Sequence, residues 1–286
     1  MKQNLNLQKQ KMSNTVKRSI FGIVFIGVML AGLLLSKFGF AALMLFILVV
    51  MMLEFHHMTV GKKFLLCRVL SIITGVILFL STFIILAFDL SGKYMAVALL
   101  PFAVLMAASL YSHDRGDFRD FSHILASVIY IALPLSLSNF VVFDGTEFSG
   151  QLMLGFFIII WASDVGAYIF GISLGQKYGK KLFPEVSPKK SWIGFWGGIF
   201  SSMLAGLILG LTGFFGYEFY HCVILGAIMG VFGVYGDLFE SMWKRSSNVK
   251  DSGGIIPGHG GLLDRFDSSL FAIPAGVLYL VLLNLV

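Results

Sequence analysis

Uninterrupted apolar runs of about 20 residues constrain this chain more than any other feature of its sequence. Of the 286 residues, 57% are hydrophobic and only 13% are charged. A helix needs about 20 apolar residues to cross the hydrocarbon core of a bilayer, and soluble domains average about 25% charged residues. The runs do not alternate as barrel strands do, so the pattern predicts an all-α, polytopic integral membrane protein.

Nine runs are long enough to be membrane spans. They lie at 19–36, 38–54, 69–88, 94–111, 122–143, 150–174, 193–215, 220–239 and 269–286. The first two, separated only by Ser36 and Lys37, predict either a tight helical hairpin or one broken element. We favour an uncleaved first span over a cleaved signal peptide.

Three regions follow from these runs. They are a basic cytoplasmic segment at 1–18, N-terminal membrane helices at 19–149, and a C-terminal membrane region at 150–286 with polar loops at 175–192 and 240–268. The polar chemistry of the chain is concentrated in the last of these regions.

The distribution of basic residues predicts the orientation. If the N-terminus is cytoplasmic, every one of the 21 Lys and Arg residues except Lys37 and Lys93 falls on the cytoplasmic side. Cytoplasmic loops carry such an excess in membrane proteins. Both polar loops then face the compartment that contains nucleotides and Mg²⁺. The net charge of +6 therefore reflects topology, and we expect no nucleic-acid partner. Cys67 and Cys222 fall on opposite faces, which predicts no disulfide.

The passage from Ser241 to Asp267 is chemically richer than a connector needs. It contains cations, carboxylates, a histidine and a glycine pair, namely Ser241, Lys244, Arg245, Lys250, Asp251, His259, Gly260, Gly261, Asp264, Arg265 and Asp267. Solvation alone would require only small polar residues. The mixture instead suits a metal-bound polyphosphate.

Two acidic residues lie inside apolar spans, Asp164 and Asp237. A carboxylate in hydrocarbon is costly unless it is paired, hydrated or bound to a cation. Small residues around both positions leave room for a pocket. The sequence therefore indicates a polar cavity open to the cytoplasm, and an interfacial carboxylate paired with a nearby lysine is the alternative.

The spacing of the acids suggests a cation site. Asp264 and Asp267 are three residues apart and share a helical face, and Asp237 belongs to another helix. Three such carboxylates would form an oxygen cage suited to Mg²⁺. Capping of the last span is the alternative role for Asp264 and Asp267.

Two further segments are typical of anion-binding turns. Gly260 and Gly261 precede a helix start, where backbone N–H groups can receive anionic oxygens. His259 beside them is an acid–base group, a hydrogen-bond donor to phosphate or a structural turn residue. The segment with Ser187, Lys189 and Lys190 also precedes a helix; contact with anionic lipid headgroups is its alternative role. Glu54, His56 and His57 are interpreted as an interfacial helix end.

These residues resemble a known family. The series from Ser241 to Asp267 resembles the signature of phosphatidate cytidylyltransferases, also called CDP-diacylglycerol synthases. Asp164 followed by Ala167-Tyr168, and the segment Ser187–Trp192, add to the resemblance, which covers roughly residues 150–286. The family usually carries a Glu soon after this Trp, where the chain has Ile193.

The resemblance implies a membrane enzyme that converts CTP and phosphatidic acid to CDP-diacylglycerol and diphosphate with Mg²⁺, with room for a second cation. Asp237, Asp264 and Asp267 are then the metal ligands. The other residues implied in catalysis are Lys244, Arg245, Lys250, His259 and Arg265. Those implied in substrate binding are Asp164, Ser187, Lys189, Lys190, Ser241, Asp251, Gly260 and Gly261. A homodimer in a bacterial inner membrane, with its active site facing the cytoplasm, is expected.

Three other functions fit parts of the sequence. A secondary transporter of an anionic solute would explain Asp164 and Asp237, but it predicts paired interrupted spans in both halves, which the sequence lacks. Another CTP-dependent membrane enzyme, such as a lipid-alcohol kinase, would move the γ-phosphate instead. A membrane scaffold would leave the 241–267 chemistry unexplained.

Overall fold

The computed structural model describes residues 22–111, 118–254 and 260–286. Within these ranges eight helices are long and apolar enough to cross a membrane, and a shorter apolar helix spans Gly22–Leu34. The all-α polytopic fold is confirmed. The shorter helix falls in the first predicted span, which begins outside the described residues, so the count of nine stays a prediction.

The membrane helices include several segments joined end to end. They are α2 (Lys37–Thr59); α3 (Leu65–Ala87); η1 (Gly92–Ala98) with α4 (Leu99–Leu110); α5 (Phe118–Ser127) with the π-helical turn η2 (Val128–Ala132), α6 (Leu133–Leu137) and η3 (Ser138–Val141); α7 (Gln151–Phe170) with η4 (Gly171–Gly175) and α8 (Gln176–Tyr178); α9 (Trp192–Leu211); α10 (Phe219–Ser246); and α11 (Leu263–Phe266) with α12 (Ser269–Leu282).

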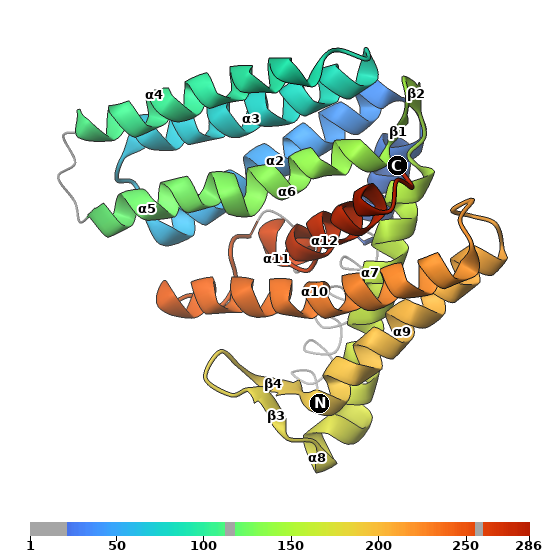
Figure 1. The fold of residues 1–286 in the computed structure, drawn as a ribbon. Helices are drawn as coiled ribbons and strands as arrows, with labels where there is room; N and C mark the ends of the chain where they lie inside the picture. The colour runs from blue at the N-terminus through green and yellow to red at the C-terminus, as the bar shows by residue number, and fades with distance from the viewer. Residues whose placement is uncertain (1–21, 112–117, 255–259) are drawn as a thin grey trace, which may run out of the picture.

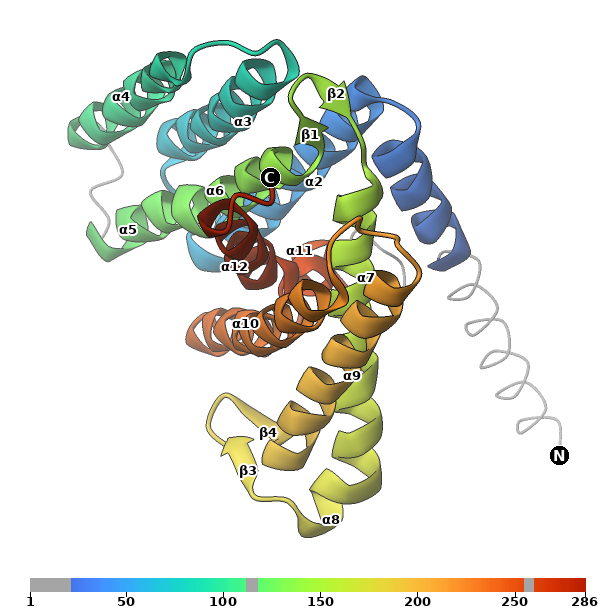
Figure 2. The same cartoon turned by 45° about the vertical axis from the view of Figure 1, so that its right-hand side comes forward.

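The first two apolar runs form two separate helices. The Ser36 side chain caps α2 by accepting a hydrogen bond from the Gly39 N–H at 3.0 Å. Gly32 of the preceding helix faces the Leu43 side chain of α2 at a distance that leaves no room for a Cβ. The structure therefore shows the hairpin rather than the broken single element (Figure 2).

The helices form two groups that meet along α12. In Figure 1, α12 lies between α6 and α10, while α7 and α9 cross α10 at its N-terminal end. Phe266, which is 1% exposed, packs between Phe25 and Phe157 from the two halves of the chain. Aromatic packing thus links the N-terminal helices to the C-terminal region that carries the polar motifs.

Small residues set the spacing of α7, α9 and α10. Gly166 of α7 lies against Ser201 of α9, and Gly226 of α10 lies against the Ser202 backbone carbonyl. Without hydrophobic attraction between helices in lipid, such close backbone contact is the main source of packing energy. The glycines in these spans are therefore packing residues.

Two short antiparallel hairpins interrupt the helices. Strands β1 (Phe143–Asp144) and β2 (Glu147–Phe148) pair before α7, and strands β3 (Lys181–Phe183) and β4 (Ser187–Ser191) pair before α9. The sequence predicted only a loop at 175–192. The β3–β4 hairpin brings Lys190 beside α10, where it pairs with Asp237.

The predicted loop at 240–268 is shorter than expected, because α10 continues seven residues beyond the predicted span end, to Ser246. Hydropathy falls there, but helix formation does not require apolar residues. Glu240 and Lys244 pair at i and i+4, and Lys244 and Arg245 lie in the last turn, where cations favour the helix dipole. Ser241, Lys244 and Arg245 are thus helical residues.

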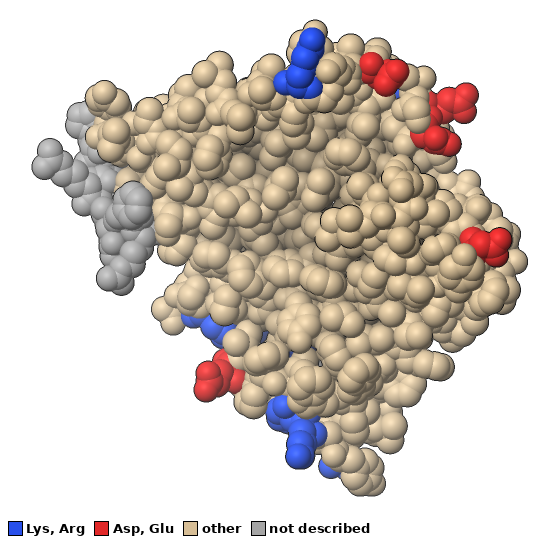
Figure 3. All heavy atoms as spheres, viewed as in Figure 1, with Lys and Arg blue, Asp and Glu red and all other residues tan. Residues whose placement is uncertain are grey.

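Charged side chains are sparse on the face shown in Figure 3. They lie near its edges, and the broad middle of this face is uncharged. Large apolar side chains are exposed along the spans, for example Leu100 and Leu211, each 69% exposed. This surface suits a hydrocarbon environment.

We predict that Gly226→Ala separates α9 from α10. The added methyl group would overlap the Ser202 carbonyl, and such overpacking costs about 1–3 kcal/mol. The apparent melting temperature in detergent should fall by several degrees. Gly27→Ala is the matched control, because a Cβ at Gly27 meets nothing within 4 Å. Equal melting temperatures for the two variants would contradict this packing role.

Candidate functional site

The polar residues of the C-terminal region converge where α7, α10, β4 and the α11–α12 junction meet. Ser268, at the start of α12, donates a hydrogen bond to Asp164 of α7 at 3.2 Å. A Cβ at Gly236 of α10 would lie 2.5 Å from the Asp267 carbonyl oxygen. Asp164, Asp237 and Asp267 are thus brought to one place by three elements far apart in sequence.

Lys190, in strand β4 of the hairpin, also belongs to this group. Its Nζ lies 2.5 Å from the Oδ2 atom of Asp237, and the two side chains are 24% and 34% exposed. Ser241, one helical turn after Asp237, donates to its Oδ1 atom at 3.4 Å. Asp237 therefore links α10 to β4.

The carboxylate of Asp267 lies amid other acids. It accepts the N–H of Ser268 at 2.7 Å, and it interacts electrostatically with Asp164, Asp237 and Glu240. Like charges held together destabilise the folded protein unless a cation or a proton neutralises them. This concentration of acids therefore resembles a binding site more than a structural ion-pair network.

A second cluster lies one turn further along α10. Lys244 pairs with Glu240, which is fully buried, and its Nζ lies 2.8 Å from the Oδ1 atom of Asp264. The Oδ2 atom of Asp264 accepts the Ser252 N–H at 3.0 Å, the Ser252 hydroxyl at 2.9 Å and the Gly261 N–H at 2.8 Å. Asp264 therefore fastens the turn before α11 to α10.

Glu54 of α2 holds the same turn from the N-terminal half. Only 5% exposed, it accepts the N–H groups of Leu262 at 3.0 Å and Leu263 at 2.9 Å. The sequence interpretation as an interfacial helix end missed this role. An acid within an apolar helix was the available signal, but its partners lie more than 200 residues away.

Gly253 and Gly261 leave room for the side chain of Glu54. A Cβ at Gly253 would lie 2.5 Å from the Glu54 Oε1 atom, and one at Gly261 would lie 2.6 Å from Oε2. Gly260 has a φ of +84°, which disfavours other residues. The N–H of Gly261, expected to receive a ligand oxygen, instead donates to Asp264 in this structure.

The remaining predicted site residues lie around these clusters. Arg245 donates to the Val186 carbonyl of the hairpin at 3.4 Å, and Arg265 interacts electrostatically with Asp164. Lys189, Lys250 and Asp251 are exposed, and Ser187 is half-buried in β4. His259 lies outside the described residues.

The donor chemistry of the acid cluster suits a hard divalent cation, because such ions prefer carboxylate oxygens. Within the described ranges, however, no group of three or more His, Cys, Asp or Glu side chains is arranged to hold a metal ion. Lys190 and Lys244 already contact Asp237 and Asp264. Any ion at this site would have to displace or share these lysine contacts.

We predict that Glu54→Gln destabilises the protein and reduces its activity. The amide keeps one acceptor oxygen, but its NH₂ group would face a backbone N–H, leaving a buried donor unsatisfied at a cost of about 1–3 kcal/mol. The melting temperature in detergent measures the loss of stability. Glu147→Gln, at an exposed position in β2, is the control, and a Glu54→Gln variant as stable as this control would refute the proposed attachment of the turn.

Comparison with known proteins identifies the family of the chain. The model of the cytidylyltransferase family matches residues 16–283, which includes the N-terminal half where the motifs gave no specific resemblance. The chain is 38% identical over 172 residues to a phosphatidate cytidylyltransferase of Staphylococcus haemolyticus (strain JCSC1435). It is 39% identical over 174 residues to the protein of that name from Staphylococcus aureus (strain COL).

Each of these alignments covers 60% of this chain and 63% of the relative, which is less than two thirds of the relative's length. The family match, by contrast, runs through all the elements that form the two clusters, from Glu54 in α2 to the start of α12. On that match, the chain belongs to the cytidylyltransferase family.

Proposed function

We propose that this protein transfers the cytidylyl group of CTP to phosphatidic acid, giving CDP-diacylglycerol and diphosphate. Membership of the cytidylyltransferase family and the name of the staphylococcal relatives support this reaction. The observation that carries it is the convergence of Asp164, Asp237, Asp267 and Lys190 where α7, α10, the β3–β4 hairpin and the start of α12 meet. For this reaction, both a lipid headgroup and a soluble nucleotide must reach the site.

The reaction needs little acid–base chemistry. A phosphate oxygen of phosphatidic acid forms a bond to the α-phosphorus of CTP, and the bond from that phosphorus to the oxygen bridging to the β-phosphorus breaks. Diphosphate leaves with the electron pair. The main barriers are bringing two polyanions together and stabilising the charge of the leaving group. A site for this reaction must therefore supply positive charge.

Basic residues around the clusters supply part of that charge. Lys190 and Lys244 lie between the hairpin, α10 and α11, where each contacts a carboxylate. A bound cation could replace either lysine as the partner of that carboxylate and leave the lysine free to bind phosphate. We assign them, with Lys189, Arg245, Lys250 and Arg265, to the phosphates of the two substrates. Ser187, Ser241, Asp251, His259, Gly260 and Gly261 are assigned to shaping the CTP pocket, and Asp164 to lining the cavity.

The proposed metal ligands remain Asp237, Asp264 and Asp267, for Mg²⁺ with room for a second cation. When bound, the ion would supply positive charge to the triphosphate. Asp237 and Asp267 lie on elements in direct contact, and Asp164 adds a third carboxylate nearby. Asp264 would have to exchange Lys244 for the ion, so the contacts favour Asp237 and Asp267 as the first ligands.

The proposed location is the bacterial cell membrane with the site facing the cytoplasm. The apolar helices and the staphylococcal relatives support a bacterial membrane. The bias of Lys and Arg supports the orientation, and the substrate supply agrees with it, because CTP is cytoplasmic.

One assay tests the reaction and separates it from its alternatives. Purified protein receives phosphatidic acid, Mg²⁺ and CTP labelled at either the α- or the γ-phosphate, with an EDTA control. Label from the α-position should enter the lipid fraction and γ-label should leave as diphosphate. Transfer of γ-label to a lipid alcohol would establish a kinase instead, and solute uptake by proteoliposomes without lipid product would establish a transporter.

We predict that Asp267→Asn and Asp264→Asn both lose activity but differ in their effect on the stability of the protein. Both should lose about 100-fold or more of their turnover, because each removes a charge from the site. Asp267→Asn relieves repulsion among acids and should not lower the melting temperature. Asp264→Asn keeps only one acceptor oxygen, so its NH₂ group would face either Lys244 or the donors of Ser252 and Gly261, and the melting temperature should fall by roughly 5 °C or more.

Each variant is assayed for turnover and for melting in detergent. Full activity of Asp267→Asn would remove this residue from the proposed metal site. An unchanged melting temperature for Asp264→Asn would contradict its structural role in the turn.

A further inference from the structure

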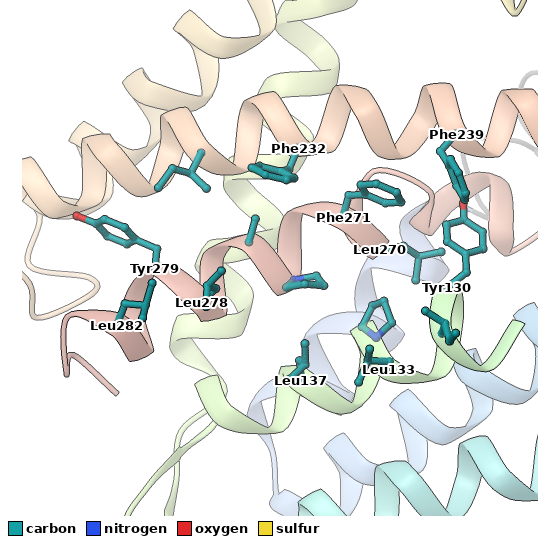
Figure 4. Close-up of a pocket in the computed structure, with 15 residues that line it drawn as sticks. Tyr130, Leu133, Leu137, Phe232, Phe239, Leu270, Phe271, Leu278, Tyr279 and Leu282 are labelled. Atoms are coloured by element: carbon teal, nitrogen blue, oxygen red, sulfur yellow. The ribbon is translucent and has the colours of Figure 1, made fainter. Parts of the chain in front are cut away.

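A wide apolar groove runs along the bundle between α6, α10 and α12 (Figure 4). Its volume is about 660 Å³, within the range of small-molecule sites. Leu133, Leu278 and Leu282 in its walls are 40%, 58% and 70% exposed, so the groove is open on the outer face of the helices. These helices are membrane spans, and the groove therefore faces lipid.

One end of the groove adjoins the acid cluster. Phe239 lies two residues after Asp237 on α10, and Phe271 lies four residues after Asp267 on α12. A smaller apolar hollow of about 310 Å³ shares both phenylalanines and extends to Phe183 of the hairpin that carries Lys190. The groove is thus continuous with the elements that position the charged groups.

The hydroxyl of Tyr130 lies at this junction. Tyr130, in the π-helical turn η2, is 7% exposed and packs its ring against Phe239 with centroids 5.1 Å apart. Its hydroxyl has no hydrogen-bond partner among the described residues, although it interacts electrostatically with Asp237 and Asp267. Figure 4 shows this hydroxyl directed toward α10. Buried tyrosine hydroxyls usually have a partner, and π-helical turns are frequent at functional sites.

Resting on the proposed function, we propose that the groove binds one acyl chain of phosphatidic acid and that Tyr130 donates a hydrogen bond to the ester carbonyl of that chain. The lipid presents phosphate, ester and hydrocarbon in order, and the protein presents charged cluster, hydroxyl and apolar groove in the same order. A neutral carbonyl suits a hydroxyl beside carboxylates, whereas a second anion would be repelled.

The length of the groove agrees with this occupant. Phe271 and Leu282 are eleven residues apart on the α12 side, which corresponds to roughly 16 Å along a helix. Half of the roughly 30 Å hydrocarbon core, the share of one chain, is of the same length. A second copy of the protein would also cover apolar surface, and crosslinks between copies would reveal it.

The first experiment tests the hydrogen bond through the chemistry of the lipid. Wild-type protein should prefer diacyl phosphatidic acid over the dialkyl ether analogue, which lacks ester carbonyls, by about three- to tenfold in kcat/KM. Tyr130→Phe should lose this preference through a higher KM for the diacyl lipid alone. The control Tyr94→Phe, at a half-exposed position in η1, should keep it. Equal preferences in wild type and Tyr130→Phe would overturn the assignment.

The second experiment fills the groove. Leu133→Trp and Leu278→Trp should lower the ratio of kcat/KM for long-chain over short-chain phosphatidic acid at least fivefold. Leu204→Trp on α9, where the leucine is 45% exposed and does not line the groove, should leave the ratio unchanged. Gel filtration in detergent checks the fold of each variant. A ratio unaffected by both groove variants would exclude acyl-chain binding there.

The third experiment does not depend on turnover. Phosphatidic acid with a diazirine at the end of one chain is irradiated with the protein, and labelled peptides are identified by mass spectrometry. Label should concentrate in 129–137 and 270–282, and excess unlabelled phosphatidic acid should reduce it. Uniform, uncompeted labelling of all helices, or crosslinks between copies, would overturn the proposal. Wild-type protein that forms no CDP-diacylglycerol would refute the proposed function, and photolabelling would still decide the groove.

Discussion

The site depends on two acidic side chains that accept backbone N–H groups at residue 252 and at residues 261–263. Glu54 and Asp264 together accept the N–H groups of Ser252, Gly261, Leu262 and Leu263. Buried N–H groups without acceptors are costly, and few other acceptors exist where apolar helices surround the backbone. Because Glu54 lies on α2, this attachment also makes the N-terminal helices part of the framework that positions the beginning of the last span.

The carboxylates of the two clusters are arranged differently from one another. Asp264 is saturated with donors, whereas Asp267 lies among like charges and Asp237 depends on a single lysine for its ion pair. Repulsion of this kind lowers stability, and proteins commonly accept such a cost at functional sites. On the proposed function, the cluster around Asp264 fixes the geometry of the turn, and the cluster around Asp267 keeps charge available for ligands.

Polar and apolar features share the same helices. On α10, Asp237 and Lys244 face the charged clusters while Phe232 and Phe239 line the apolar groove, and α12 begins beside Asp267 and continues along that groove. An amphiphilic substrate has to meet both kinds of surface in a fixed order. The membrane helices of a cytidylyltransferase-family protein can provide this order without a separate soluble domain, because one helix carries charged side chains on one face and apolar side chains on another.

The sequence by itself determined the membrane fold, the approximate spans and the passage that holds the charged residues, because hydropathy and local motifs are properties of neighbouring residues. It placed the end of α10 too early, since hydropathy does not report where a polar helix stops. It also left Glu54 as a helix end. Only the tertiary structure decided that Glu54 holds the turn before α11, that Lys190 reaches Asp237 and that Tyr130 lies between the acids and the groove, because these contacts join residues tens to hundreds of positions apart.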